Sequence, residues 1–345
     1  MKFALLCASV AMCVTSWAQS PPSRPFRMGF SHIPPRQTIE EVITTVNMWT
    51  QRGDGAIDHR DVPWRELLTG TTPEKYVREN MRGLYDYYRQ KKLAITIMME
   101  PADGLDRTKE SPVLLSMGRS IAEPEVQKVY VEFVAYVAQT IRPDYLGLVS
   151  EANMLLDNYT PSVRAGLIKM ANDAAKRVAK ASGKTKPYVS VQTEYAWGKL
   201  GTVVPYRGID ATYAAFPFMK ALGISTYPYF GWDSPASIPD DYFSRLRGQR
   251  ALPLVVDEGG WPSAPVGDLN STPQRQLQWF DRLITLSRTS GVTFLSQLTF
   301  TDLDLPADAP PMLNLFASLG LVDKNYAPKP ALGRWDQEFA LPFRP

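Results

Sequence analysis

The sequence predicts an α/β fold, a single (β/α)₈ TIM barrel, on the basis of its apolar pattern. Eight short apolar runs alternate with longer amphipathic segments along 345 residues. The runs are nearly continuous rather than strictly alternating, as in strands of a parallel sheet that helices cover on both faces. The structural alternative is a doubly wound open sheet, but no glycine-rich phosphate loop follows the first run, where such folds often carry one.

The expected strands follow one another without a linker or low-complexity run between them. They are 26–30, 55–58, 93–99, 145–149, 188–193, 222–227, 252–256 and 292–300. The clearest helices between them are 38–50, 73–90, 124–141, 161–181 and 273–289. Three of these begin at a Thr-Pro pair, which supplies an N-cap and a preset first turn: Thr72-Pro73, Thr160-Pro161 and Thr272-Pro273. We therefore expect one domain over residues 19–345.

Residues 1–18 have the pattern of a signal peptide rather than of a folded element. Lys2 precedes the apolar run 3–14, and Ser16-Trp17-Ala18 places small residues where a signal peptidase reads them. We therefore expect a secreted or periplasmic protein. Both cysteines, Cys7 and Cys13, lie in this segment, so the mature chain would have no disulfide and no thiolate nucleophile. No later apolar stretch reaches the length of about 18 residues that a membrane anchor needs.

Charge and motifs exclude several classes of function. Lys and Arg number 38 against 35 Asp and Glu, a net charge of +3, so no basic field favours nucleic acid as a partner. The two histidines are too few and too far apart in the sequence for an HxH or HExxH metal motif. No G-x-S-x-G elbow of a serine hydrolase occurs. We therefore expect neither a metal nor an organic cofactor.

Acidic side chains stand at the ends of four predicted strands. They are Glu100, Glu151, Glu194 and Glu258. In a (β/α)₈ barrel the carboxyl ends of all strands meet at one face, which is where active sites lie. Carboxylates directly after apolar strands are costly to desolvate unless they are used or paired. The sequence therefore predicts a site at this face, although one or two of these glutamates could simply pair with Arg or Lys.

The residues around two of these glutamates resemble a known clan. Glu151 ends the fourth strand, and Glu258 ends the seventh and is followed by Gly-Gly-Trp-Pro-Ser at 259–263. These features, together with Gly-Ile-Ser-Thr-Tyr-Pro-Tyr at 223–229 and the closing segments 319–323 and 329–332, are similar to retaining glycoside hydrolases built on (β/α)₈ barrels. The endo-β-1,4-galactanase and related β-glycanase families are nearest. The resemblance covers most of the mature chain.

The resemblance implies a monomeric, retaining β-glycoside hydrolase acting on a β-linked oligo- or polysaccharide. Glu151 would be the acid/base, Glu258 the nucleophile, and Tyr227 a group that approaches the nucleophile. The two carboxyl groups would stand about 5 to 5.5 Å apart, and the charge of Glu258 would favour the protonated form of Glu151. This assignment requires that both carboxyl groups share one cleft and that neither is buried against a permanent cation.

Two positions depart from the pattern of the clan. Ser150 stands where many members have an Asn that binds the sugar, which leaves Asn153 as a candidate for that role. Phe300 stands near the end of the eighth strand, where many members have a Trp. Ser150 keeps open an alternative function, a carbohydrate-binding barrel protein that is catalytically impaired. Transglycosylation is the other alternative.

Further residues are candidates for contacts with the sugar. His32 and His59 lie at the ends of the first two strands, Trp197 and Trp232 follow later strands, and Trp261 could offer a flat apolar face. Glu194 is expected to orient the substrate or to serve the structure. Packing is an equally open interpretation for the histidines and for the two loop tryptophans.

Overall fold

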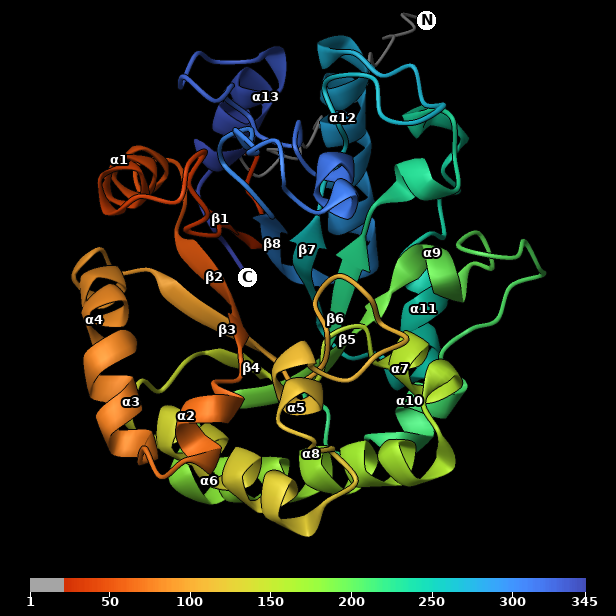
Figure 1. Cartoon of the computed structure of the whole chain (residues 1–345). Coiled ribbons are helices and arrows are strands. Elements are labelled where there is room, and N and C mark those ends of the chain that lie inside the picture. The colour runs from red at the N-terminus through yellow and green to blue at the C-terminus, as the bar shows by residue number, and fades with distance from the viewer. Residues whose placement is uncertain (1–21) are drawn as a thin grey trace, which may run out of the picture.

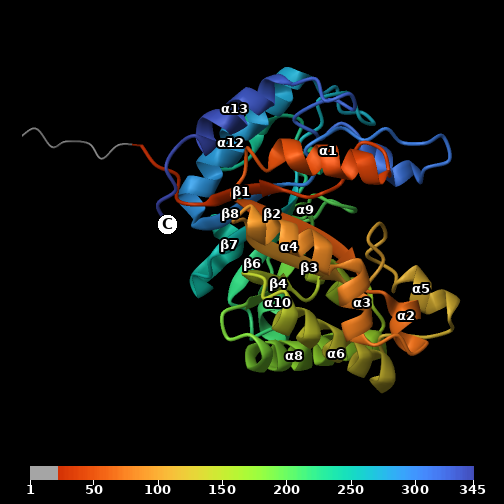
Figure 2. The same ribbon diagram turned by 90° about the vertical axis from the view of Figure 1, so that its left-hand side faces the viewer.

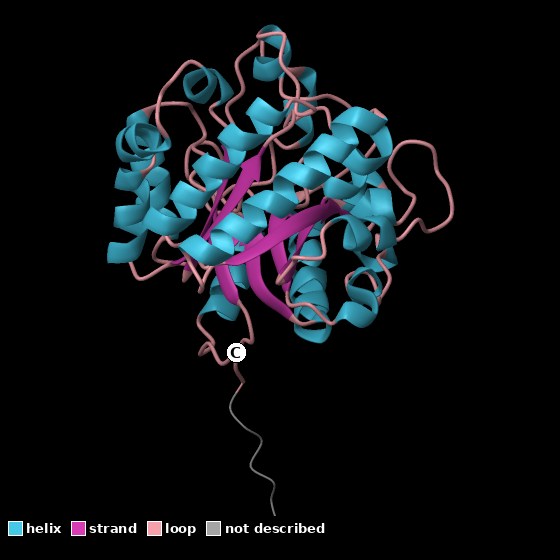
Figure 3. Cartoon of the chain, turned by 90° about the horizontal axis from the view of Figure 1, so that it is seen from below, coloured by secondary structure: helices cyan, strands magenta, loops and turns pink. Residues whose placement is uncertain are grey.

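Eight parallel strands form a closed barrel in chain order, as the sequence predicts (Figures 1 and 3). The computed structural model describes residues 22–345, so the predicted signal peptide and both cysteines lie outside the described residues. The strands are β1 (Arg27–Phe30), β2 (Gly55–Asp61), β3 (Ala94–Glu100), β4 (Tyr145–Gly147), β5 (Lys186–Gln192), β6 (Ala221–Thr226), β7 (Leu254–Gly259) and β8 (Val292–Gln297). The barrel closes where β1 pairs with β8.

Helices surround the barrel and cover its outer face (Figure 3). The longer ones are α1 (Ile39–Trp49), α3 (Pro73–Asn80), α4 (Arg82–Gln90), α6 (Pro124–Thr140), α8 (Pro161–Ala181), α12 (Pro273–Ser290) and α13 (Pro330–Phe339). The predicted helix 73–90 is two helices that meet at Met81. Thr72 and Thr272 cap their helices by accepting a backbone N–H, whereas Thr160 makes no such side-chain bond. None of the described helices is long and apolar enough to cross a membrane.

Short helices lie in the connections that follow the strands. They are α2 (Trp64–Leu68), α5 (Pro112–Ser116), α7 (Ala152–Asn158), α9 (Thr193–Ala196), α10 (Asp210–Ala215) and α11 (Ser244–Arg247), with 3₁₀ turns η1 (Pro228–Phe230), η2 (Pro235–Ser237), η3 (Gly248–Arg250) and η4 (Pro311–Leu315). Figure 2 shows the barrel from the side, with α2 and α5 far from the chain's C-terminus.

Apolar side chains fill both sides of the barrel wall. The interior holds a compact cluster to which Met98, Tyr188, Val255 and Phe294 belong, contributed by β3, β5, β7 and β8. A much larger core lies between the wall and the helices. The barrel is packed rather than hollow, and the glutamates of the predicted site lie at the carboxyl ends of its strands.

Candidate active site

Three of the four predicted glutamates meet at the carboxyl end of the barrel. Glu100 is the last residue of β3, Glu151 follows β4, and Glu258 lies near the end of β7. Arg107, in the loop between β3 and α5, contacts both Glu100 and Glu151. Glu194 is separate from this group and binds other partners.

The backbone at Glu151 has a left-handed conformation, with φ 45° and ψ 44°. A residue with a side chain adopts this conformation at a cost, so the surrounding structure must hold it. The Glu151 N–H donates to Ser190 Oγ on β5 at 3.0 Å, which fixes the turn. The turn directs the carboxyl group toward β6, where the Ser225 hydroxyl donates to Oε1 at 2.7 Å.

A bulge in β7 places the Glu258 side chain at the site. Val256 pairs with Ile224, but the next residue of β6, Ser225, pairs with Glu258, so Asp257 is an extra residue. Val255 lies in the interior cluster, and strict alternation would turn Glu258 outward. An extra residue re-aims the side chains that follow it. In its resulting position, Glu258 Oε1 accepts a hydrogen bond from the Tyr227 hydroxyl at 2.5 Å.

The carboxyl groups of Glu151 and Glu258 are neighbours through Ser225. Ser225 donates to Glu151 and is the β-sheet partner of Glu258 on the adjoining strand. Burial and the charge of Glu151 raise the pKa of Glu258, while His59 and Arg107 oppose this effect. The sequence-based expectation was that Glu258 would hold the proton on Glu151. The structure adds a cation to this pair, because the Arg107 guanidinium contacts Glu151 directly.

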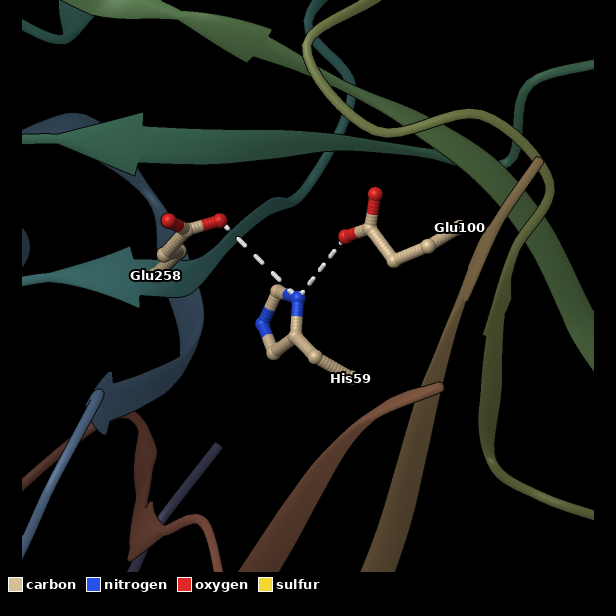
Figure 4. A group of neighbouring side chains, drawn as sticks. All are labelled: His59, Glu100 and Glu258. Carbon is tan, nitrogen blue, oxygen red and sulfur yellow. Dashed lines mark hydrogen bonds and ion pairs between the residues drawn. The ribbon is translucent and has the colours of Figure 1, made fainter. Parts of the chain in front are cut away.

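His59 lies between Glu100 and Glu258, as Figure 4 shows. Its Nδ1 is 3.1 Å from Glu100 Oε1 and 3.9 Å from Glu258 Oε2, and its Nε2 is 3.0 Å from the carbonyl oxygen of Asp257. A carbonyl only accepts, so Nε2 carries a hydrogen, and Nδ1 faces two carboxyl groups. Burial lowers the pKa of His59, but Glu100 and Glu258 outweigh it and raise the pKa to about 10. His59 is therefore an imidazolium that links the two acids.

The ligand atoms of His59, Glu100 and Glu258 lie within 4.8 Å of one another, close enough to share a metal ion. A metal-binding imidazole must offer a lone pair, yet here Nδ1 faces Glu100 and Nε2 faces a carbonyl. The donor set suits an ion-paired imidazolium better than a metal ligand, and we assign no metal to it.

Arg107 is the functional residue that the sequence did not reveal. Its Nε donates to Glu151 Oε2 at 2.8 Å, one terminal nitrogen donates to Glu100 at 2.8 Å, and the other donates to Ser150 Oγ at 3.1 Å. Its side chain is 6% exposed. The requirement that neither catalytic carboxyl be buried against a permanent cation is therefore not met. The sequence held one indirect signal for such a residue. Several acids gather at one face of the barrel, and a group of buried carboxylates needs a cation nearby.

Glu194 is completely buried and does not reach the site as a substrate ligand. It accepts hydrogen bonds from the Tyr242 hydroxyl, the Gln192 amide at 2.6 Å and the Tyr227 backbone N–H at 3.1 Å. Burial raises the pKa of Glu194 to about 7, although these donors oppose the increase. Because Tyr227 in turn donates to Glu258, Glu194 helps to position a residue that contacts Glu258.

Three predicted contacts with sugar are wrong. Trp261 is completely buried, where it packs against Trp279 and donates to Ser271 Oγ at 3.0 Å. Phe300 is completely buried, edge-on to Phe30 in the core. Asn153 uses both ends of its amide on the backbone of Gln192. These side chains follow strands, but the local chain turns them into the protein, away from the cleft.

The remaining candidates all have partners, and all of them except Ser150 stay accessible in part. Ser150 is buried and accepts from Arg107, and it is not free to replace the missing Asn. Trp197 and Trp232 pack edge to face with each other, beside Tyr242. His32 Nδ1 lies 3.5 Å from Asp58, with the side chain 28% exposed. Contacts of His32 and the two tryptophans with a sugar stay predictions.

A cavity of about 560 Å³ opens beside Glu258 and Tyr227. Its wall comes from the loops after β1, β3 and β8 and is mostly aliphatic, with Pro34, Leu298 and Leu303 among the lining residues. The residues that line this cavity do not include Glu151, Trp197 or Trp232. The cavity therefore gives a ligand access to one member of the carboxyl pair.

Comparison with solved structures identifies glycoside hydrolases with the same barrel. The exo-β-1,4-mannosidase Op5Man5 of Opitutaceae bacterium strain TAV5 has a TM-score of 0.68 and 14% identity over 92% of this chain. A GH5_18 protein of Streptomyces cattleya, in complex with GlcNAc, has a TM-score of 0.67 and 15% identity over 94%. A GH10 endoxylanase from a sugarcane soil metagenome has a TM-score of 0.62 and 12% identity over 90%.

The chain spans 59% of the mannosidase, 83% of the GH5_18 protein and 97% of the xylanase. No protein-family model matches the chain, and no curated protein matches its sequence. The comparisons therefore confirm the predicted fold, a (β/α)₈ barrel like those of this exo-β-1,4-mannosidase, GH5_18 protein and GH10 endoxylanase.

Proposed function

We propose that the chain is a retaining β-glycoside hydrolase in which Glu258 is the nucleophile and Glu151 the acid/base. The observation that carries the proposal is the meeting of these two carboxyl groups across Ser225, at the ends of β4 and β7. A pair of carboxyl groups on either side of a glycosidic bond is the arrangement that retaining hydrolysis needs. The cavity beside Glu258 would hold the sugar on the glycone side of that bond.

Tyr227 has a direct role in this proposal. Its hydroxyl donates to Glu258 Oε1, so it fixes one oxygen and leaves the other to attack the anomeric carbon. Hydrogen bonds that are already formed cost no reorganisation during the reaction. His59, as an imidazolium near Oε2, favours the carboxylate form of Glu258 that attack requires. Export through residues 1–18 and a monomeric state belong to the proposal as well.

Separate substitution of the two glutamates tests the proposal. With an activated aryl β-glycoside, Glu258→Ala and Glu151→Ala should each lower turnover by at least about a hundredfold. Azide should restore both, giving a glycosyl azide of inverted configuration with Glu258→Ala and of retained configuration with Glu151→Ala. Proton NMR of the products distinguishes the two anomers. The same anomer from both variants would contradict the assigned roles.

A second function, a sugar-binding barrel without turnover, is favoured by the ion pair of Arg107 with Glu151. A carboxylate held by a buried guanidinium does not readily donate a proton. Mass spectrometry after incubation with a fluorinated, activated glycoside separates the two functions. A covalent adduct on Glu258 supports the hydrolase, whereas sugar affinity without any adduct supports the binding protein.

A further inference from the structure

We infer that the natural substrate is a β-glycoside whose leaving group is acidic, such as a phenol or a carboxylic acid, rather than another sugar. The inference rests on the proposed function and narrows the class of substrate of the same site: it keeps Glu258 as the nucleophile and Glu151 as the base of the second step, but not Glu151 as an acid in the first step. Its basis is the set of contacts that hold Glu151, the group that would otherwise protonate the leaving oxygen.

Both carboxyl oxygens of Glu151 accept hydrogen bonds. Oε2 accepts from Arg107 Nε at 2.8 Å, and Oε1 accepts from the Ser225 hydroxyl at 2.7 Å. A guanidinium N–H can only donate, so Oε2 is the acceptor in this contact. A carboxyl group with donors on both oxygens and a cation in contact is arranged as a carboxylate.

Arg107 is fixed too firmly to move aside at low cost. Besides Glu151 it donates to Glu100, to Ser150 and to the carbonyl oxygen of Asp103 at 3.0 Å. The Arg107 side chain is almost fully buried. Moving it aside would therefore break several charge-assisted hydrogen bonds in a place where water does not replace them. The cavity also reaches Glu258 but not Glu151.

The reaction then proceeds without a proton for the leaving group. A carboxylate oxygen of Glu258 forms a bond to the anomeric carbon, and the bond from this carbon to the aglycone oxygen breaks. The electron pair goes to the aglycone, which leaves as a phenolate or carboxylate anion. Water then attacks the anomeric carbon, Glu151 takes the water proton, and the ester bond to Glu258 breaks. The proton passes from Glu151 to solvent, and the products are the sugar, the anion and one proton.

A sugar leaving group does not fit this scheme. A sugar hydroxyl is a weak acid, so its oxygen must be protonated as the bond breaks, and general acid catalysis contributes a factor of about 10² to 10⁴. The site as arranged does not supply that proton. Under this inference the substrate is an aryl or acyl β-glycoside rather than the β-linked oligo- or polysaccharide expected from the sequence.

The test uses the full-length mature protein and three glycosides of one sugar: dinitrophenyl, phenyl and methyl. This set is prepared for glucose, galactose, mannose and xylose, because the preferred sugar is unknown. We expect kcat/KM to fall by at least about a hundredfold from dinitrophenyl to phenyl, with no turnover of the methyl glycoside. Comparable kcat/KM for all three leaving groups would overturn the inference and leave the proposed function intact. A wild type that turns over none of them would overturn both.

Glu151→Gln provides the second measurement. We expect kcat on the dinitrophenyl glycoside to fall about a hundredfold, because the attacking water loses its base. The dinitrophenyl-to-phenyl ratio of kcat/KM should remain within about threefold of the wild-type ratio. If Glu151 donates a proton, the variant instead widens this ratio by a further factor of about 10² or more, which overturns the inference. Glu132→Gln, at an exposed position on α6, is the matched control for loss of a carboxylate.

Discussion

Replacing Arg107 by Met should destabilise the protein at neutral pH and much less in acid. Methionine keeps much of the buried aliphatic volume but removes the cation that contacts Glu100 and Glu151. Removing one partner of a buried ion pair costs about 3 to 5 kcal/mol, because the remaining charge stays buried. The loss should therefore depend on whether the two acids are ionised.

The pKa of Glu100 indicates the size of the electrostatic contribution, which Arg107 and His59 share. Burial alone would raise that pKa, but the charge of Arg107 and the hydrogen bond from His59 outweigh burial and lower it from 4.5 to about 2. At about 1.4 kcal/mol per pH unit, the lowered pKa contributes about 3 kcal/mol of stability at neutral pH. Because the folded-state pKa is lowered, this stability is present above about pH 4.5 and is lost as the pH falls toward 2.

Urea unfolding of wild type and Arg107→Met, near pH 7 and near pH 3, measures the effect. We expect the variant to be less stable by about 3 to 5 kcal/mol near pH 7 and the difference to shrink near pH 3. Arg82→Met is the control, since Arg82 pairs with Asp86 at the surface, where such a pair contributes about 0.5 kcal/mol or less. An equal loss for Arg107→Met at both pH values would refute the reasoning, because it would show that packing, and not charge, was removed.

Three further changes test the groups around Glu258. Tyr227→Phe removes the hydroxyl that donates to Glu258. Steady-state kinetics should show kcat/KM reduced about 10- to 100-fold. An unchanged kcat/KM would contradict the role of the Tyr227 hydroxyl. Burial raises the pKa of Glu194 to about 7, so the wild type should lose stability as the pH rises from about 4.5 to 7. Urea unfolding of Glu194→Gln should not show this decline. The same dependence of stability on pH in the variant and the wild type would contradict the raised pKa of Glu194. Gly259→Ala would place a methyl carbon 2.3 Å from a backbone oxygen. Thermal unfolding should therefore show a loss of about 1 to 3 kcal/mol in stability, together with lower activity. The control Gly183→Ala, where the new methyl group meets open space, should match the wild type.

Most of the barrel was predictable because its determinants are local. A nearly continuous apolar run predicts a strand buried on both faces, and each of the eight runs overlaps a strand of the structure. The Thr-Pro pairs gave the starts of α3, α8 and α12 correctly. The break at Met81 was missed, because the apolar and polar residues continue through it and the one nearby signal, Gly83, is tolerated inside a helix.

The aromatic residues of the site were the least predictable. Trp261 and Phe300 follow strands, as a sugar-binding residue would, but both enter the core. Their direction depends on neighbouring segments, since Trp261 meets Trp279 of α12 and Phe300 meets Phe30 of β1. An isolated pattern of residues does not contain these distant partners.

The sequence by itself determined that acids gather at the carboxyl ends of the strands, because the apolar runs set the barrel and the barrel sets where their last residues lie. Only the tertiary structure decided what each acid does. Arg107 reaches Glu151 across 44 positions of the chain, and the bulge at Asp257 turns Glu258 toward Tyr227. The physical reason is that the protonation of a buried carboxyl group depends on charges and donors within a few ångströms, and these come from segments that meet only when the barrel closes.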